Sequence, residues 1–220
     1  MNKAAVTVVI PTFRRPEGLR RAVNSIFAQN YAAEFELILV DNDPGASAAG
    51  LMQELSKTRP KHITLTCLHE AEAGVANARN CAMDRVTTRL VAFLDDDQSA
   101  PTGWLTALLA NHAEFPAAVT FGPVETALPE TVTQHRAYFS DFFARTLEAS
   151  SGFIETYFGC GNALFDLDRL PDERPLFDPR MNASGGEDDM LFARIQRDGA
   201  RFAWCADVPV FEHVPTRRAA

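Results

Sequence analysis

The first half of the chain alternates between short apolar runs rich in β-branched residues and longer segments in which apolar residues recur every three or four positions. Continuous apolar runs are typical of the buried strands of a parallel sheet, and the second pattern is typical of amphipathic helices that cover such a sheet. The pattern therefore predicts strands and helices in alternation. The expected strands are Val6–Ile10, which Pro11 should stop, Phe35–Val40, His62–Leu68 and Leu90–Leu94, and the expected helices are Pro16–Phe27, Ser47–Leu55 and Val75–Val86.

The second half is less regular, and its expected elements are shorter. Thr102 is expected to cap a helix that runs through His112, and Pro123–Ser151 is expected to be a mobile excursion with a helical piece around Tyr138–Leu147. The remaining elements are strands at Ala118–Phe121 and Tyr157–Phe165, a helix at Gly186–Arg197 and two short strands within Arg201–Phe211. The whole pattern predicts an α/β fold: a single Rossmann-like domain over residues 1–220, with a mostly parallel central sheet flanked by helices and an irregular C-terminal half.

Composition narrows the functions open to such a fold. The 220 residues carry 21 Lys and Arg against 29 Asp and Glu, a net charge of −8. Nucleic-acid-binding surfaces are basic, so we expect no nucleic-acid partner. The 4 cysteines are far apart and form no C-x-x-C pair, which argues against a zinc site and against a disulfide framework.

The start of the chain lacks the features of a secretory signal. Met1 leads into the apolar run Val6–Ile10 without a charged segment, a longer apolar segment and a small-residue cleavage site. No apolar run approaches the roughly 18–20 residues that span a bilayer. We therefore expect a cytoplasmic protein.

Three polar clusters follow directly after predicted strands: Pro11-Thr12-Phe13-Arg14, Asp41-Asn42-Asp43 and Asp95-Asp96-Asp97. Ligands of an open parallel sheet bind at the carboxyl ends of its strands, and these ends share one edge. Asp, Asn and Pro also end strands and cap helices, so turn chemistry explains any single cluster equally well. Their convergence on one edge favours a binding site.

The triple aspartate carries the most chemical information. In an extended strand, Asp95 and Asp97 lie on one side and Asp96 on the other. Carboxylates this close repel one another unless a cation lies among them, and oxygen ligands suit Mg²⁺ or Mn²⁺. Such an ion takes one or two carboxylates and completes its shell with phosphate oxygens and water. The cluster predicts a divalent ion that joins the protein to a diphosphate; the alternative is a solvated acidic turn.

In their order along the chain, these clusters resemble the family 2 glycosyltransferases of the GT-A fold. The matching segments are Ile10–Pro16, Leu39–Asp43, Gly74–Asn80 and Phe93–Asp97, and Gly185–Asp188 is similar to the family's later acidic motif. Each segment alone is weakly specific, but the ordered set covers nearly the whole chain. Gly161-Asn162 and Phe211–Pro215, together with that acidic motif, look closest to bacterial exopolysaccharide enzymes of the succinoglycan-glucosyltransferase type.

The resemblance implies a nucleotide-binding half over residues 1–100 and an acceptor-binding half over residues 101–220. It implies that Asp41 accepts a hydrogen bond from the base and that Asp96 faces the ribose. The other implied nucleotide-sugar contacts are Pro11, Thr12, Arg14, Asp43, Arg79 and Asp95. Asp95 and Asp97 would form the family's D-x-D motif for Mn²⁺ or Mg²⁺, with Asp97 the more direct ligand. Arg14 and Arg79 are open to the alternative reading of surface or helix-face arginines.

Three acids follow Gly185-Gly186 at the start of the last predicted helix. By resemblance, Asp188 is the catalytic base that takes the proton of an acceptor hydroxyl, and Glu187 orients the acceptor. The positive end of the helix dipole favours the ionised carboxylate that such a base needs. Asp189 is a competing candidate, and acids at this position also stabilise a first turn without any catalytic role.

Two further candidates lie near the C-terminus. Several GT-A enzymes use a late histidine as a metal ligand, so the resemblance implies this role for His213 and a diphosphate contact for Arg217. Imidazole suits Mn²⁺ better than Mg²⁺. The alternative is that His213 is structural, which is the commoner role of a lone histidine.

Together these residues predict an inverting, metal-dependent glycosyltransferase. Its donor would be a nucleotide-sugar, with a uridine nucleotide favoured by family frequency, and its acceptor a hydroxyl of a saccharide or lipid-linked saccharide. A single displacement needs one base and no protein nucleophile, which suits a chain without an evident Ser–His or Cys–His pair. Family members often continue into membrane-facing segments, so peripheral association with the inner face of the membrane is an alternative to a purely cytoplasmic location.

Two other functions stay open at this point. A sugar-nucleotide nucleotidyltransferase shares a similar front half, but its first strand leads into a glycine-rich phosphate loop, and here no glycine occurs before Gly18. A non-catalytic nucleotide-sugar-binding subunit would bind the diphosphate without turnover.

Overall fold

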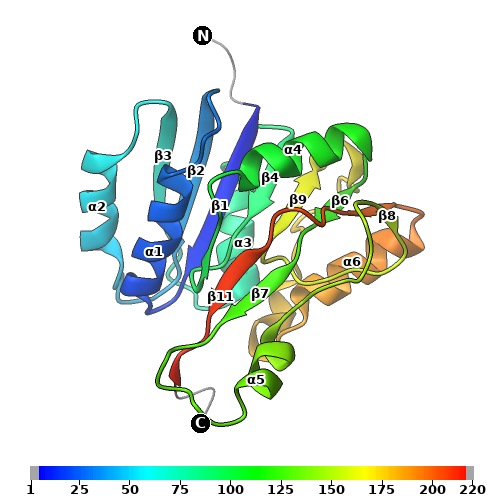
Figure 1. Cartoon of the computed structure of the whole chain (residues 1–220). Helices are drawn as coiled ribbons and strands as arrows, with labels where there is room; N and C mark the ends of the chain where they lie inside the picture. Colours follow the sequence, from blue (N-terminus) through cyan, green and yellow to red (C-terminus); the bar gives the residue numbers. More distant parts are fainter. Residues whose placement is uncertain (1–4, 217–220) are drawn as a thin grey trace.

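The predicted alternation of strands and helices is present in the first half of the chain. A computed structural model describes residues 5–216, and its first four strands run parallel to one another (Figure 1). The elements are β1 (Val6–Thr12), α1 (Pro16–Phe27), β2 (Phe35–Asp41), α2 (Ala49–Thr58), β3 (Ile63–His69), α3 (Val75–Met83) and β4 (Leu90–Phe93).

The second half of the chain extends the same sheet. The 8 strands have the order β3-β2-β1-β4-β9-β6-β10-β8. Strand β9 is antiparallel to its neighbours β4 and β6, β10 is parallel to β6, and β8 is antiparallel to β10. The sheet is therefore mostly parallel, as predicted. The added strands are β6 (Val119–Phe121), β8 (Gly152–Ile154), β9 (Ala163–Asp166) and β10 (Phe202–Trp204).

A smaller sheet joins the C-terminal strand to the acid cluster. Its 3 strands have the order β5-β11-β7, and β5 follows directly after Asp97. Sequence patterns do not predict β5 and β7, because neither segment has the continuous apolar run by which the equally short β4 was predicted. The remaining elements are β5 (Gln98–Ser99), β7 (Val124–Ala127), β11 (Val210–His213), α4 (Trp104–Glu114), α5 (Arg136–Phe143), α6 (Glu187–Arg197), and the 3₁₀ turns η1 (Leu167–Arg169) and η2 (Pro179–Ala183).

The helices are short. The longest within residues 5–216, α1, has 12 residues. Over the same residues, no helix combines the length and the apolar character that crossing a membrane requires.

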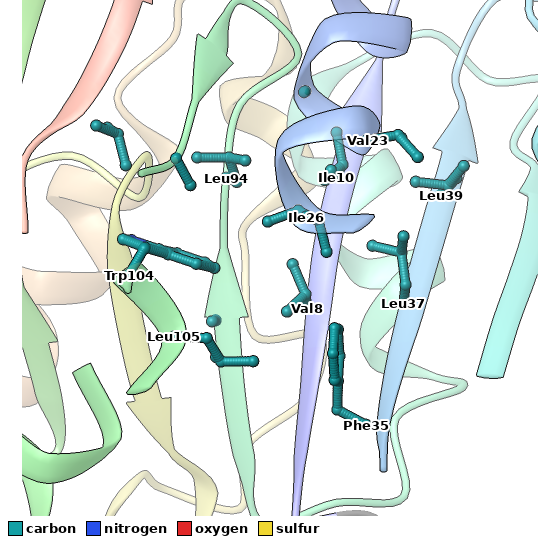
Figure 2. Packing of buried hydrophobic residues seen from close by; sticks show 14 of the residues in the cluster. Val8, Ile10, Val23, Ile26, Phe35, Leu37, Leu39, Leu94, Trp104 and Leu105 are labelled. Carbon is teal, nitrogen blue, oxygen red and sulfur yellow. The ribbon is translucent and has the colours of Figure 1, made fainter. Parts of the chain in front are cut away.

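Apolar side chains cover both faces of the central sheet. On the near face in Figure 1, Val8 and Ile10 of β1 pack with helices α1, α2 and α4, and Figure 2 shows Val23 and Trp104 from two of these helices closing over the strands. On the other face, Val9 packs with α3 and α6. Because successive strand residues point to opposite faces, every position of β1 is buried.

Pro11 does not stop β1, contrary to the expectation. The strand continues through Pro11 to Thr12 in parallel register with β2. The carbonyl of Val9 accepts the N–H of Leu94 on the β4 side, and Pro11 faces the same side, where β4 has already ended at Phe93. The missing N–H of proline therefore removes no hydrogen bond from the sheet.

Three other expectations need correction. Helix α4 begins after Gly103 and has no side-chain cap, so Thr102 does not cap it. Of the expected strand Tyr157–Phe165, only the last part forms β9, because Asn162 turns the chain with a φ of +67°. The segment Pro123–Ser151 contains β7 as well as α5, and β7 pairs along its length with β11.

Asn162 connects the two halves of the chain at the end of β4. Its Nδ2 donates to the carbonyls of Pro123 at 2.7 Å and Val208 at 3.2 Å, and its Oδ1 accepts from Nε1 of Trp104 at 2.7 Å. Its backbone N–H donates to the carbonyl of Phe93 at 3.1 Å. Asn162 thus fixes the point from which the acid cluster leaves the sheet.

Replacement of this residue should be costly. In Asn162→Ala, Nε1 of Trp104 and the carbonyl of Val208 lose their partner, the carbonyl of Pro123 loses one of two, and alanine must adopt a positive φ. We therefore expect the free energy of unfolding to fall by about 3 kcal/mol. Urea denaturation followed by circular dichroism measures this change. The control is Asn24→Ala on the exposed face of α1, which should change stability by less than about 0.5 kcal/mol. Equal effects of the two variants would contradict the connecting role of Asn162.

Candidate functional site

A cleft of about 850 Å³ opens at the carboxyl ends of β1 and β4. Its wall is formed by the end of β1, the first turns of α3, the acids that follow β4, and a residue of η2. Among the residues predicted from the sequence, the cleft brings together Pro11, Thr12, Arg14, Arg79, Asp95, Asp96 and Asp97. Other predicted residues surround the cleft and do not line it: Asp41, Asp43, Glu187, Asp188 and His213.

The aspartates after β4 are held by a cation that the chain itself supplies. Nη1 of Arg15 donates to Oδ1 of Asp96 at 3.0 Å and to Oδ2 of Asp97 at 2.7 Å. Burial lowers the pKa of Arg15, but the charges of both carboxylates outweigh this effect and the pKa is raised overall. In this structure, the positive charge that offsets the repulsion between these carboxylates is therefore the guanidinium of Arg15.

Asp96 links the acid cluster to β1 and α1. Its Oδ2 accepts from Oγ1 of Thr12 at 2.7 Å and from the N–H of Phe13 at 3.4 Å. Gly18 of α1 lies against the same residue, because a Cβ at Gly18 would come within 2.5 Å of the carbonyl oxygen of Asp96. Burial raises the pKa of Asp96, and hydrogen bonds from Thr12 and Arg15 oppose this rise.

Arg79 of α3 joins the acid cluster to the last helix. Its Nη2 lies 3.6 Å from Oδ1 of Asp95, and its Nη1 donates to Glu187 at the start of α6. The side chains of Arg79 and Glu187 are each only 5% exposed, and the guanidinium lies over the ring of Phe177. Burial opposes the charge of Arg79, yet its pKa is raised because the surrounding carboxylates stabilise the cation. Burial raises the pKa of Asp95, and Arg79 counteracts this rise.

Asp188 lies in the first turn of α6, which begins after Gly185-Gly186 with φ values of +74° and +84°. Its Oδ2 accepts from the N–H of Cys160 at 3.1 Å. Asp188 is near enough to Asp95 for its charge to raise the pKa of that residue. Asp189, the next acid, is exposed. The structure therefore brings the start of α6 to the acid cluster and leaves Asp188 only partly buried.

Two predicted contacts are buried away from the cleft. Asp41 is 1% exposed, and its two oxygens accept from the N–H groups of Asp43 at 3.1 Å and Ala48 at 2.7 Å. Glu187 is occupied by its ion pair with Arg79. The proposed contacts of Asp41 with a base and of Glu187 with an acceptor stay predictions, and the structure gives both carboxylates a positioning role.

The turn after β2 organises the opposite wall of the cleft. The side chain of Asn42 holds residues 70–74: its Nδ2 donates to the carbonyls of Glu70 and Glu72, and its Oδ1 accepts from the N–H of Gly74. Nε of Arg14 donates to Oδ1 of Asp43 at 2.9 Å, and this hydrogen bond holds the pKa of Asp43 below its ordinary value. Arg14 has a φ of +55°, and its side chain is 65% exposed.

His213 lies beside the acids, but its ring turns toward β5. Its N–H donates to the carbonyl of Asp97 at 2.7 Å, and its Nε2 lies 2.8 Å from Oγ of Ser99. Burial lowers the pKa of His213, and the charge of Asp97 opposes this effect. Its role as a metal ligand stays a prediction. Arg217, the expected diphosphate contact, lies outside the described residues.

The acid cluster can supply only part of the coordination shell of a divalent ion. Within residues 5–216, no three His, Cys, Asp or Glu side chains are grouped as ready metal ligands. Asp95 and Asp97 are 31% and 18% exposed, and Mg²⁺ needs only one or two carboxylates where phosphate oxygens and water complete its shell. The oxygen donors therefore fit such an ion, and Arg15 must release Oδ2 of Asp97 before that oxygen can be a ligand.

Sequence reasoning missed three residues of the site: Arg15, Asn182 and Arg145. Oδ1 of Asn182 accepts the N–H of Ala76 at 2.9 Å, so a distant turn satisfies a free N–H in the first turn of α3. Arg145 pairs with Glu212 of β11 at 3.1 Å, and its positive charge, with that of Arg79, opposes the rise that burial causes in the pKa of Asp95. Only Arg15 carried a sequence signal, since it directly follows a predicted cluster and precedes the first helix.

Comparisons with known sequences point to one family. The family model described as Glycosyl transferase family 2 matches residues 7–169. Succinoglycan biosynthesis protein ExoM of Rhizobium meliloti (strain 1021) is 32% identical over 217 residues, which cover 98% of this chain and 69% of ExoM. The Escherichia coli protein named UDP-Glc:alpha-D-GlcNAc-diphosphoundecaprenol beta-1,3-glucosyltransferase WfgD is 30% identical over 97 residues, 44% of this chain and 36% of WfgD.

Solved structures show the same fold. TarS 1-349 of S. aureus in complex with UDP matches with a TM-score of 0.74 at 15% identity, over 95% of this chain and 60% of that one. TarS 1-349 in complex with UDP-GlcNAc matches with a TM-score of 0.73 at 17% identity, over 96% of this chain and 58% of that one. The predicted GT-A fold is confirmed.

The buried pair between Arg79 and Glu187 yields a stability prediction. In Glu187→Gln, Arg79 loses its closest counter-ion in a buried position, so we expect the free energy of unfolding to fall by about 3 kcal/mol. The matched control is Glu173→Gln, because Glu173 pairs with Arg194 but is 67% exposed, and its loss should cost less than about 1 kcal/mol. Urea denaturation compares the two. A loss in Glu187→Gln no larger than in the control would contradict the account of the buried pair.

Proposed function

This chain belongs to glycosyl transferase family 2, and on that premise we propose that it moves a sugar from a nucleotide-sugar to a hydroxyl of a saccharide or lipid-linked saccharide by an inverting single displacement. The observation that carries the proposal is the ion-pair network of Arg79. One buried guanidinium binds Asp95 of the acid cluster and Glu187 at the start of α6. Arg79 thereby holds the acid cluster on the donor side and the acids of α6 on the acceptor side in fixed positions relative to each other.

The donor would occupy the cleft at the end of β1. Pro11, Thr12 and Arg14 line its wall together with the first turn of α3. A uridine nucleotide is the proposed donor base, because WfgD carries UDP-Glc in its name and TarS was crystallised with UDP and UDP-GlcNAc. The acceptor of WfgD, a diphosphoundecaprenol-linked sugar according to its name, supports a lipid-linked acceptor here.

Asp95 and Asp97 would hold the divalent ion, Mn²⁺ or Mg²⁺. When bound, this ion neutralises the charge of the leaving nucleoside diphosphate. In this role the two carboxylates bind the ion and do not attack the sugar, which agrees with a single displacement.

Asp188 would be the general base. Its carboxylate takes the proton of the acceptor hydroxyl, the oxygen of that hydroxyl forms a bond to the anomeric carbon, and the bond from that carbon to the diphosphate breaks on the opposite face. An α-linked donor then gives a β-linked product. Asp188 lies in the first turn of α6, at the positive end of the helix dipole, and the N–H of Cys160 donates to one of its oxygens. Glu187 would position Asp188 through the first turn of α6.

Two substitutions test this assignment. We expect Asp188→Asn and Asp97→Ala each to lower the transfer rate by about 10²–10⁴-fold, because the first removes the proton acceptor and the second a ligand of the ion. The assay follows transfer from UDP-sugars to an undecaprenyl-diphosphate-linked saccharide in the presence of Mn²⁺. The control is Asp198→Asn at the other end of α6, which is exposed and should keep wild-type activity.

Other outcomes would change the proposal. Full activity in both Asp188→Asn and Asp97→Ala would contradict the mechanism. Loss of activity in Asp189→Asn, with Asp188→Asn unaffected, would move the base to Asp189. Release of pyrophosphate from a nucleoside triphosphate and a sugar phosphate would favour a nucleotidyltransferase instead.

A further inference from the structure

Arg15 reaches the acids because helix α1 begins against them. Its carbonyl accepts the N–H of Leu19, so the residue stands at the N-terminal end of α1, and Pro16 follows it in the first turn. Gly18 packs on the backbone of Asp96 with no room for a Cβ. The start of α1 is therefore pressed onto the acid cluster, and the side chain of Arg15 has a short path to the carboxylates.

The two arginines of the site differ in their freedom to move. Arg79 is 5% exposed, and its guanidinium is enclosed by Glu187 and the ring of Phe177. Arg15 is 45% exposed, lines the cleft, and uses a single nitrogen, Nη1, to contact both Asp96 and Asp97. Arg79 is thus a fixed counter-ion, whereas Arg15 can rotate into the cleft without opening the core.

Arg15 holds the carboxylate that a divalent ion would need. Oδ2 of Asp97 lies 2.7 Å from Nη1 of Arg15, a distance at which no ion fits between them. A guanidinium and a divalent cation also repel each other at close range. At Oδ2 of Asp97, contact with Arg15 and contact with a metal ion are therefore alternatives.

We propose that Arg15 is an exchangeable internal counter-ion: it neutralises Asp96 and Asp97 in the donor-free protein, and it yields Asp97 to the divalent ion when a nucleoside diphosphate enters. This inference rests on the proposed function. The diphosphate gives the displaced guanidinium a new partner, since arginine forms strong charge-assisted hydrogen bonds with phosphate oxygens. Arg15 is then a positioning residue that makes metal binding depend on the nucleotide.

The test measures metal binding with and without nucleotide. Mn²⁺ binding to the full chain is followed by electron paramagnetic resonance and by calorimetry, alone and with saturating UDP. In the wild type we expect UDP to tighten Mn²⁺ binding by about 10–100-fold, a usual range for coupled sites. In Arg15→Gln we expect Mn²⁺ alone to bind about tenfold more tightly than to the wild type and the effect of UDP to shrink accordingly.

Two further variants separate charge from position. Arg20→Gln removes one positive charge from the same helix, but Arg20 pairs with Glu54 on the surface, so we expect wild-type coupling. Arg15→Lys keeps the charge without the planar guanidinium, and we expect an intermediate coupling. Thermal unfolding of each variant checks that it is folded, and Arg15→Lys replaces Arg15→Gln if the latter is not.

The outcomes separate a failure of the role proposed for Arg15 from a failure of the proposed function. Equal Mn²⁺ affinities of the wild type and Arg15→Gln without UDP would overturn the role of Arg15, while UDP-dependent Mn²⁺ binding in both would leave the proposed function standing. Wild-type Mn²⁺ binding by Asp97→Ala in the presence of UDP would overturn both the inference and the metal ligand on which it depends.

Discussion

Repulsion among carboxylates crowded at one edge of the sheet is the constraint on which the rest of the site depends. Asp95, Asp96 and Asp97 are consecutive and begin two residues after the end of β4, and the start of α6 brings further acids toward them. Crowded carboxylates stay ionised only where cations or hydrogen-bond donors meet them. Arg79 does so from the buried side and Arg15 from the open side. One fixed and one exchangeable counter-ion offset the repulsion among the acids when no ligand is bound, and the exchangeable one can give way to a different cation when a ligand binds.

The core of the fold determines where these counter-ions lie. Asn162 ties the end of β4 to segments from the second half of the chain, and the cluster starts two residues beyond that point. Gly18 lets α1 approach the backbone of Asp96. Asn182 holds the first turn of α3, the helix that carries Arg79. Each of these contacts is made by the backbone or by a side-chain amide, so the positions of the charged groups follow from the packing of the elements that carry them.

Much of the fold, but less of the site, could be predicted from the sequence. Strands buried on both faces and amphipathic helices leave clear patterns, and α1 was predicted with its observed bounds because Pro16 marks its first position. The β5 and β7 strands were missed because neither has a continuous apolar run. Part of the expected strand Tyr157–Phe165 failed because its turn depends on a left-handed Asn162. Arg14 and Arg15 show how far the site could be predicted from the sequence. The positive φ of Arg14 accompanies its pairing with Asp43, while Arg15 meets the acids, and nothing in the residue types distinguishes them.

The most direct test of the account is a crystal structure of this chain with Mn²⁺ and UDP bound together. The account predicts an ion in contact with Asp97, the guanidinium of Arg15 turned from the acids toward the diphosphate, and Arg79 unmoved between Asp95 and Glu187. A nucleotide-bound structure in which Arg15 still bridges Asp96 and Asp97, with no ion beside them, would contradict it.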